Sequence, residues 1–199
     1  IKRGKFSVRP RNDPRYFGGQ TPFVQTGDVV AAQKYLTRFS QTLNDDGVAI
    51  SKVFPAGTIL TTIAANIGDT AITTFPVACP DSVVGIIPRD GEADVEWLNA
   101  VLQTKKAELE AKAPQNAQKN INLEALRPLR ILMPPFLEQL RIAEILSAWD
   151  QAIDTVDALI DNARTQNRAL MQSLLTGRRR LPGFHVPWIH NTISDISTR

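Results

Sequence analysis

The chain carries one long heptad repeat of apolar residues, and this repeat restricts its possible folds more than any other feature. Its members are Ile142, Leu146, Trp149, Ile153, Val156, Ile160, Ala163, Asn167, Leu170 and Leu174. They lie alternately four and three residues apart, the repeat of about 3.5 residues typical of a helix that packs against another helix. Because the 199 residues contain no second heptad run of similar length, the partner helix must come from a second copy or from another part of a longer protein.

The composition is that of a globular protein. Hydrophobic residues make up 43% and charged residues 22% of the chain, enough for one ordinary core and a long helix. Apolar runs such as residues 71–77 are too short to span a bilayer, and nothing resembles a signal peptide. The single cysteine, Cys79, rules out an internal disulfide and argues against a thiolate metal site. We therefore expect a cytoplasmic protein without a membrane partner.

Positive charge is concentrated near the N-terminus, although the net charge is only +3. The first fifteen residues contain one anion, Asp13, and the cations Lys2, Arg3, Lys5, Arg9, Arg11 and Arg15. With Phe6, Tyr16 and Phe17 among them, the segment is typical of an exposed edge that contacts a phosphate backbone. A solvated basic terminus is the alternative. A second basic cluster, residues 178–180, follows a predicted helix end, where cations also favour the helix dipole.

Short apolar runs separated by Gly, Pro, Asn and Asp predict an α+β domain over residues 1–133. The predicted strands are residues 21–30, 48–51, 58–63, 71–78, 82–87 and 131–133. The predicted helices are a short one at residues 33–43 and a longer one at residues 95–113, which Pro114 ends.

The heptad helix is predicted to follow Pro134-Pro135 and to end before Gly177. Proline is tolerated in a first helical turn, and Glu138 would lie near the positive end of the helix dipole. A helix from Pro135 to Leu175 is about 60 Å long. Asn167 is the polar member of the seam. It either fixes one pairing register, as a buried Asn does in coiled coils, or occupies a solvated position where the pair frays.

Several motifs occur in a particular order along the chain. They are Arg3-Gly4-Lys5, residues 22–29 (PFVQTGDV), residues 54–60 (FPAGTIL), Ile67-Gly68, residues 118–121 (QKNI), residues 134–139 (PPFLEQ) and residues 170–177 (LMQSLLTG). Together they resemble the specificity subunit of type I restriction-modification systems, in which a target recognition domain precedes a P-P-x-x-E-Q segment and a long coiled-coil helix. One departure is Asn116-Ala117, where the family often has a glycine.

The resemblance implies a division of labour. The domain would read half of a bipartite site on double-stranded DNA, and paired antiparallel helices would act as a spacer. The subunit would bind adenine methyltransferase subunits and, in some assemblies, endonuclease or translocase subunits. Family members usually carry two domains and two helices, so this chain matches half a subunit. The partner helix would come from a homodimer, reading a split palindrome, or from the other half of a longer subunit.

On this basis the chain divides into a recognition domain at residues 1–133, a dimerisation helix at residues 134–177 and a linker or tail at residues 178–199. In the tail, Trp188 and residues 193–196 resemble the lead-in that normally precedes the Arg-Gly-Lys element of a recognition domain. The chain is therefore either cut from a longer subunit at the start of its second domain or a permuted half. In a permuted half, the tail would pack beside residues 1–6 of its own or a partner's domain.

Phosphate contacts are assigned to the six N-terminal cations, because Lys and Arg neutralise backbone charge and release counterions. Base reading needs paired donors and acceptors, which Arg, Asn and Gln supply. The candidates in loops or at strand ends are Gln20, Gln25, Lys34, Arg38, Lys52, Asn116, Gln118 and Lys119. Any of them can equally face solvent. Asp28 is expected to hold the turn at residues 25–28 rather than to contact DNA.

Two other function classes stay open. Asp81, Glu110 and Lys112 fit the loose pattern of a stand-alone nuclease with two carboxylates and a lysine around a metal ion. The second open class is a coiled-coil scaffold that does not bind DNA. Met133-Pro134-Pro135-Phe136 resembles an amino-methyltransferase motif, but Met133 cannot accept a hydrogen bond from a target amino group as Asn or Asp would. With no G-x-x-x-x-G-K loop either, we expect a non-catalytic subunit without a cofactor or metal.

Overall fold

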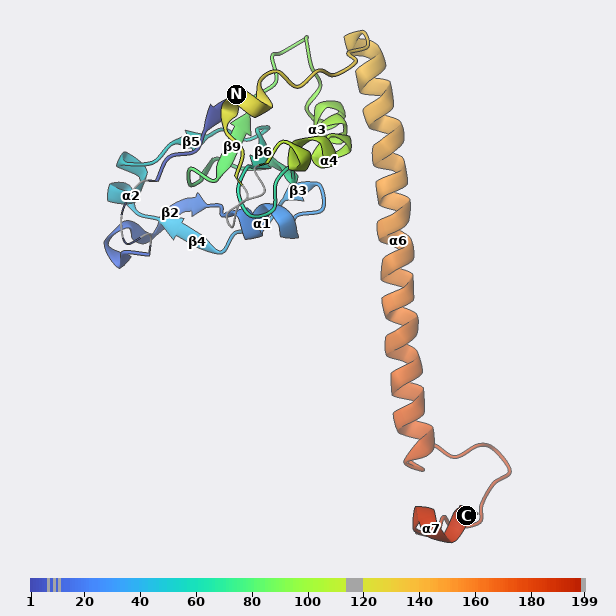
Figure 1. Ribbon diagram of the computed structural model, residues 1–199. Helices are drawn as coiled ribbons and strands as arrows, with labels where there is room; N and C mark the ends of the chain where they lie inside the picture. Colours follow the sequence, from blue (N-terminus) through green and yellow to red (C-terminus); the bar gives the residue numbers. More distant parts are fainter. Residues whose placement is uncertain (7, 9, 11, 114–119, 198–199) are drawn as a thin grey trace. The chain divides into compact units, whose positions relative to one another are not determined.

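The computed structural model describes residues 1–6, 8, 10, 12–113 and 120–197 and contains two compact units, Ile1–Ile145 and Leu146–Arg199. The first unit is a strand-rich domain with several short helices (Figure 1). Helix α6 (Phe136–Leu175) begins in the first unit and forms most of the second. The α+β class, with a strand-rich domain followed by a long helix, is confirmed.

The strands of the first unit form two sheets. One has the order β1-β9-β6-β7-β3 and the other β4-β2-β8-β5. Pairing is antiparallel except between β2 and β8 and between β3 and β7. The strands are β1 (Lys2–Arg3), β2 (Phe17–Phe23), β3 (Tyr35–Leu36), β4 (Gln41–Leu43), β5 (Val53–Phe54), β6 (Ile59–Thr62), β7 (Thr70–Thr73), β8 (Val77–Ala78) and β9 (Val83–Ile86).

Strand β6 runs through the centre of the core and is buried on both faces. Because side chains alternate across a strand, Ile59 and Leu60 enter different apolar clusters. Leu60 packs with Val24, Val29 and Phe54, which come from the neighbouring segments of the fold. The central position explains why all the residues of the predicted strand at 58–63, including its three threonines, are buried.

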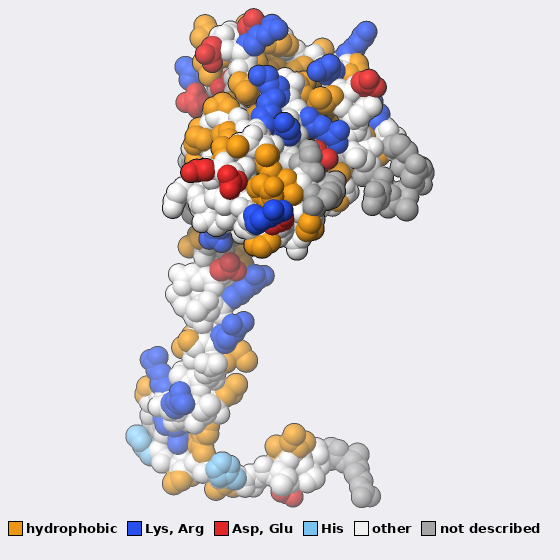
Figure 2. Space-filling model, turned by 90° about the vertical axis from the view of Figure 1, so that its left-hand side faces the viewer, with side chains coloured by type: hydrophobic (Ala, Val, Ile, Leu, Met, Phe, Trp, Pro, Cys, Tyr) orange, Lys and Arg blue, Asp and Glu red, His pale blue; other side chains and the backbone are white. Residues whose placement is uncertain are grey.

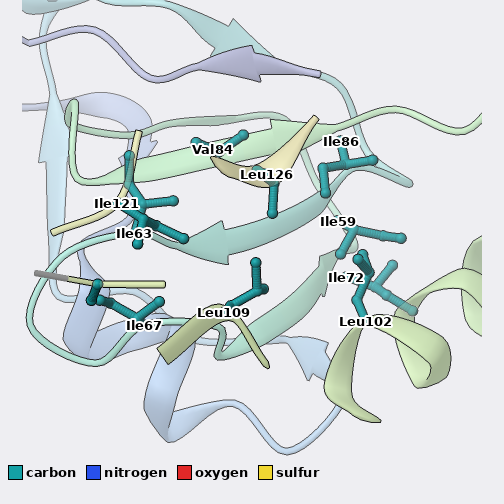
Figure 3. Close-up of a cluster of buried hydrophobic side chains, with 11 residues drawn as sticks. Ile59, Ile63, Ile67, Ile72, Val84, Ile86, Leu102, Leu109, Ile121 and Leu126 are labelled. Carbon is teal, nitrogen blue, oxygen red and sulfur yellow. The ribbon is translucent and has the colours of Figure 1, made fainter. Parts of the chain in front are cut away.

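The cluster that contains Ile59 is covered by helices α3 (Val95–Thr104), α4 (Lys106–Ala111) and α5 (Leu123–Leu126). Figure 3 shows Leu102, Leu109 and Leu126 of these helices facing the isoleucines of the strands and the segments that follow them. The predicted helix at residues 95–113 is confirmed as two helices that meet at Lys105.

Two segments predicted as strands contain helices. Residues 21–30 form β2 and then α1 (Thr26–Ala31), because Asp28 and Gln25 make a capping box at the start of α1. In the segment 48–51, the first two residues are the end of α2 (Asp45–Ala49) and the last two follow it. The N-cap of this helix, Asn44, accepts a hydrogen bond of 3.0 Å from the Gly47 amide. Caps of this kind favour a helix over the extended conformation.

Two further predictions of secondary structure were wrong. Residues 33–43 form β3 and β4 in place of a short helix, and β3 is held by its parallel pairing with β7. Residues 131–133 form no strand, and Leu132 is 95% exposed. They form a connection without secondary structure that leads to the Pro-Pro break, after which α6 begins at Phe136.

Helix α6 ends as predicted. Gly177 has a φ of +72°, a left-handed conformation that favours glycine, and Arg179 N donates to Ser173 O at 3.0 Å. Beyond it, the Trp188 ring lies beside Gly177, and the Arg180 guanidinium lies 5.1 Å from the centre of that ring. A last short helix is α7 (Ile193–Ile196). Among the described residues, none of the helices combines the length and hydropathy needed to cross a bilayer.

Candidate nucleic-acid interface

Two of the N-terminal cations, Lys2 and Arg3, form the edge strand β1 of the larger sheet, and Lys5 follows it directly. β1 pairs with β9 through Lys2 opposite Gly85 and Arg3 opposite Val84, and the Gly4 amide donates to Val83 O at 2.8 Å. Lys2, Arg3 and Lys5 are exposed, whereas Gly4 between them is buried. Arg3 Nε also donates to Asp81 O at 2.5 Å. The segment therefore exposes three cations on a backbone that the sheet holds in place, and the guanidinium of Arg3 is held to the neighbouring loop.

The aromatic residues of the basic segment belong to the core. Phe6 is only 2% exposed and packs against Phe17 and Phe23, with ring centroids 5.6 Å and 4.9 Å away. Tyr16 lies edge-on to Phe6 at 6.2 Å. These rings anchor the segment to the second sheet, while Lys2, Arg3, Lys5 and Arg15 are exposed.

Lys52 lies near the same segment. Its ammonium lies 5.7 Å from the centre of the Phe54 ring, and it lies close enough to Cys79 that its charge partly offsets the rise that burial causes in the pKa of that thiol. Cys79 in turn lies against Gly4. The fold thus brings Lys52 close to the N-terminal cations, although some fifty residues separate them in the sequence.

Arg15 is exposed but paired. Its guanidinium donates to Asp13, with an Nη2–Oδ2 distance of 2.7 Å, and lies over the Tyr16 ring at 5.7 Å. Hydrogen bonds from Arg15 hold the pKa of the Asp13 carboxyl below its usual value. Asp13 also caps the short helix η1 (Pro14–Tyr16), so this ion pair fixes the turn that leads into β2.

Other predicted DNA contacts lie around the start of α1. Gln25 Nε2 donates to Gln41 Oε1 at 2.6 Å, and Asp28 Oδ2 accepts from the Gln25 amide and from Ser40. Asp28 therefore holds this turn, as predicted. Arg38, in the loop joined to α1 by these bonds, is exposed. Gln20, in β2, is exposed as well.

Lys34 is less suited to a phosphate contact. Its ammonium lies 2.9 Å from Glu96 Oε2, and its side chain is 18% exposed. The Tyr35 hydroxyl donates to the same carboxylate. This arrangement ties the segment before β3 to the first turn of α3. Five other predicted contacts lie outside the described residues, namely Arg9, Arg11, Asn116, Gln118 and Lys119.

One face of the molecule gathers positive side chains. Figure 2 shows several Lys and Arg side chains close together on the first unit, with hydrophobic side chains between them. Such a surface attracts a polyanion and orients it before specific contacts form.

The predicted seam of α6 is exposed in the single chain. Its large members include Trp149 at 67%, Ile153 at 57% and Val156 at 53% exposed. Leu159, on the flank of the seam, is 62% exposed. Exposed apolar faces of this size are typical of surfaces that bind another protein.

The residues proposed for the nuclease alternative are not assembled into a metal site. Among the described residues, no three His, Cys, Asp or Glu side chains are grouped so that they could hold an ion. Lys112 donates to Glu108 at 3.1 Å, and Lys105 binds the same carboxylate. These hydrogen bonds lower the pKa of Glu108. They also show that Lys112, at the C-terminal end of α4, is part of a surface ion pair.

Sequence reasoning overlooked Gln139, which is fully buried and makes three hydrogen bonds to the backbone of the first unit. The available signal was its position in the PPFLEQ motif at residues 134–139. Glu96 was overlooked too, since its partners are more than sixty residues away in the sequence.

A strand-rich domain with exposed cations at one edge, followed by a long helix with an exposed heptad seam, is the arrangement expected of a DNA recognition domain with a coiled-coil helix. Residues 5–163 match the family described as type I restriction modification DNA specificity domain. The chain belongs to this family, whose members are DNA-binding specificity subunits of restriction-modification systems.

Known relatives agree with this assignment. The chain is 30% identical over 160 residues to the type I restriction enzyme MjaIX specificity subunit of Methanocaldococcus jannaschii, a match that covers 78% of this chain and 35% of that protein. It therefore spans about a third of the length of that relative.

Solved structures share the fold. The HsdS subunit from Thermoanaerobacter tengcongensis matches with a TM-score of 0.59 and 21% identity, over 80% of this chain and 37% of that one. The type I restriction-modification S subunit from M. genitalium matches with a TM-score of 0.57 and 19% identity, over 86% of this chain and 42% of that one.

Proposed function

We propose that this chain is the part of a type I specificity subunit that recognises one half of a bipartite DNA target. It directs separate adenine methyltransferase subunits, and endonuclease or translocase subunits where present, to that target. The chain itself supplies recognition and no catalysis. The single observation that carries the proposal is the exposure of Lys2, Arg3 and Lys5, on and directly after the edge strand β1, in a domain that belongs to this family.

Charge and rigidity together support a DNA interface at this edge. Cations that neutralise phosphates supply most of the sequence-independent affinity for DNA. Because β1 is paired with β9 and Phe6 is buried just beyond it, the backbone that carries these cations is fixed. Fixed phosphate contacts set the register of a protein on the duplex, and neighbouring side chains can then read base edges. Gln20, Gln25, Arg38 and Lys52 are the described residues that we assign to this second task.

The second surface of the proposed function is the seam of α6. We propose that it pairs antiparallel with the equivalent helix of a second copy or of the other half of a longer subunit. The exposure of Trp149, Ile153 and Val156 supports this pairing, because burying such side chains between helices is strongly favourable. The paired helices then hold two recognition domains a set distance apart.

The interface is tested by removing two cations from the edge strand. For Lys2→Ala with Lys5→Ala we expect weaker binding to all duplexes alike and a salt dependence reduced by about two phosphate contacts. Lys105→Ala with Lys112→Ala is the matched control, since it removes the same charge at the two ends of α4. Arg9→Ala with Arg11→Ala is expected to act like the first pair. Binding is measured by fluorescence anisotropy over a series of salt concentrations, with and without methyltransferase subunits.

Three results would contradict the proposal. Equal effects of the two double variants would remove the edge strand from the interface. Cleavage of DNA by the chain alone with magnesium would favour a nuclease. No binding with methyltransferase subunits present would favour a scaffold without a role in DNA recognition.

A further inference from the structure

Helix α6 is attached to the first unit at its very beginning. All of its residues are described, and only Gln139 and Ala143 among them are buried, with exposed fractions of 0% and 7%. Ala143 is small and apolar, and its contact has no preferred direction. Phe136 and Ile142 are half-buried and, like Ala143, apolar. Gln139 is therefore the buried residue of α6 that makes directional hydrogen bonds to the first unit.

The amide of Gln139 bonds to the backbone of two segments. Its Nε2 donates to Glu92 O at 3.0 Å and to Pro134 O at 2.9 Å, and its Oε1 accepts from the Asp94 amide at 2.9 Å. Both donor hydrogens of the side chain are thus used, together with one acceptor position. Since hydrogen bonds are directional, three of them from one planar group allow few other orientations.

The segment that Gln139 binds is itself part of the domain core. Asp94 is the N-cap of α3, where its Oδ1 accepts from the Trp97 amide at 2.8 Å. Trp97 is 3% exposed, and α3 packs over the sheet through Leu102. Gln139 therefore connects the first turn of α6 to the cap of a helix that is fixed to the sheet.

We propose that Gln139 is a positioning residue that holds the opening of α6 in one orientation on the first unit. The first turns of α6 and the recognition domain then behave as one rigid body. A consequence that rests on the proposed function is that this joint limits how far the separation of two half-sites can vary. Without Gln139, the helix opening would take several orientations on the first unit, and the protein would bind targets with a wider range of half-site separations.

The orientation is measured with nitroxide labels at Gln103→Cys on α3 and Glu144→Cys on α6, two exposed positions within the first unit. Cys79 is buried and stays unlabelled in the folded protein. We expect one narrow distance distribution in the labelled parent and loss of this single peak in Gln139→Met. Methionine fills similar space without the hydrogen bonds.

Two control variants separate positioning from stability. Gln151→Met makes the same change at an exposed position of α6. Gly4→Ala destabilises the domain far along the sequence from this joint. Both are expected to keep the narrow distribution. The proposal is overturned if Gln139→Met keeps it as well, or if Gly4→Ala loses it to the same extent.

A measurement on the unmodified chain covers the case in which Gln139→Met does not fold. The Asp94 amide, bonded to Gln139 Oε1, is expected to exchange its hydrogen as slowly as the Leu98 amide inside α3. Exchange at the rate of an unprotected amide would overturn the proposal. Neither test involves DNA, so their outcome is separate from that of the proposed function. Methylation of duplexes with varied half-site separation then tests the functional consequence.

Discussion

Gly4 occupies a position where the chain passes very close to another backbone segment. A Cβ atom at this position would lie 2.2 Å from Pro80 O and 2.5 Å from Cys79 O. Backbone atoms cannot yield as a flexible side chain can, so the N-terminal segment would have to move away from the sheet. The glycine of the Arg3-Gly4-Lys5 motif is therefore required for packing beneath two exposed cations.

We expect Gly4→Ala to lower the free energy of unfolding by about 1–3 kcal/mol, the usual cost of overpacking. Gly27→Ala is the control, because a Cβ there meets no atom within 4 Å and Gly27 lies inside α1. That variant should be neutral or gain up to about 1 kcal/mol from helix propensity. Denaturant unfolding followed by circular dichroism measures both. Equal stability of the two variants would contradict the packing role of Gly4.

Burial raises the pKa of the Cys79 thiol to about 12, and the nearby charge of Lys52 offsets this effect only in part. In the unfolded chain the thiol titrates near its ordinary pKa of 9.0. As the pH rises from 9 to 12, the unfolded state loses this proton while the folded state keeps it. The free energy of unfolding therefore decreases over this interval.

Comparison with Cys79→Ala isolates this contribution. Between about pH 8 and pH 11, the original chain is expected to lose more stability than the variant, since only the original chain contains the thiol. Denaturant unfolding at several pH values measures the difference. A parallel decline in the two proteins would show that Cys79 titrates similarly in both states.

At the scale of elements, the sequence predicted α6 with its limits. A heptad repeat extends over many turns, and both the Pro-Pro break and Gly177 act locally, so no distant partner is needed to define this helix. The short strands and helices were harder to predict. β3 has two residues and exists because of its pairing with β7, which no local pattern reveals. α2 did have a local signal, Asn44-Asp45-Asp46, which the apolar residues after it obscured.

For the candidate site, too, the sequence indicated some features and not others. The cations of β1 follow from composition, and their exposure agrees with the prediction. The burial of Phe6 depends on Phe23, and the pairing of Lys34 depends on Glu96, 62 residues away. Such contacts are set by the packing of distant segments. Sequence patterns therefore indicate which residue types gather in a region and leave open which of them are already paired.

The seam of α6 makes a prediction at the same scale. Ile153 is 57% exposed, so Ile153→Asp should leave the single chain folded and act only on association. Each buried Ile contributes about 2 kcal/mol, so a pair of substituted chains should associate roughly a hundredfold or more weakly. Thr155→Asp, which adds the same charge away from the seam, is the control. Analytical ultracentrifugation measures both, and similar dissociation constants would exclude self-pairing through this seam.

For the whole molecule, the length of α6 sets the separation of two recognition domains in the proposed pair. Deletion of residues 153–159 removes one heptad and keeps the seam in phase, shortening the helix by about 10 Å. We expect the preferred half-site separation to decrease by about three base pairs, at roughly 3.4 Å for each. Methylation assays on duplexes of graded spacing, with methyltransferase subunits added, measure this shift. An unchanged preference would show that the helix is not the spacer.

The outer strands of both sheets are very short. β1, β3 and β5 have two residues each and β4 has three. A protein that pairs through a long helix keeps two identical domains at a high local concentration, and long unpaired strands would then join edge to edge or exchange between copies. Outer strands of two or three residues offer too few free amide and carbonyl groups to pair with a strand of another copy. In the proposed helix pair, the short outer strands therefore protect the two tethered domains against edge-to-edge association and strand swapping.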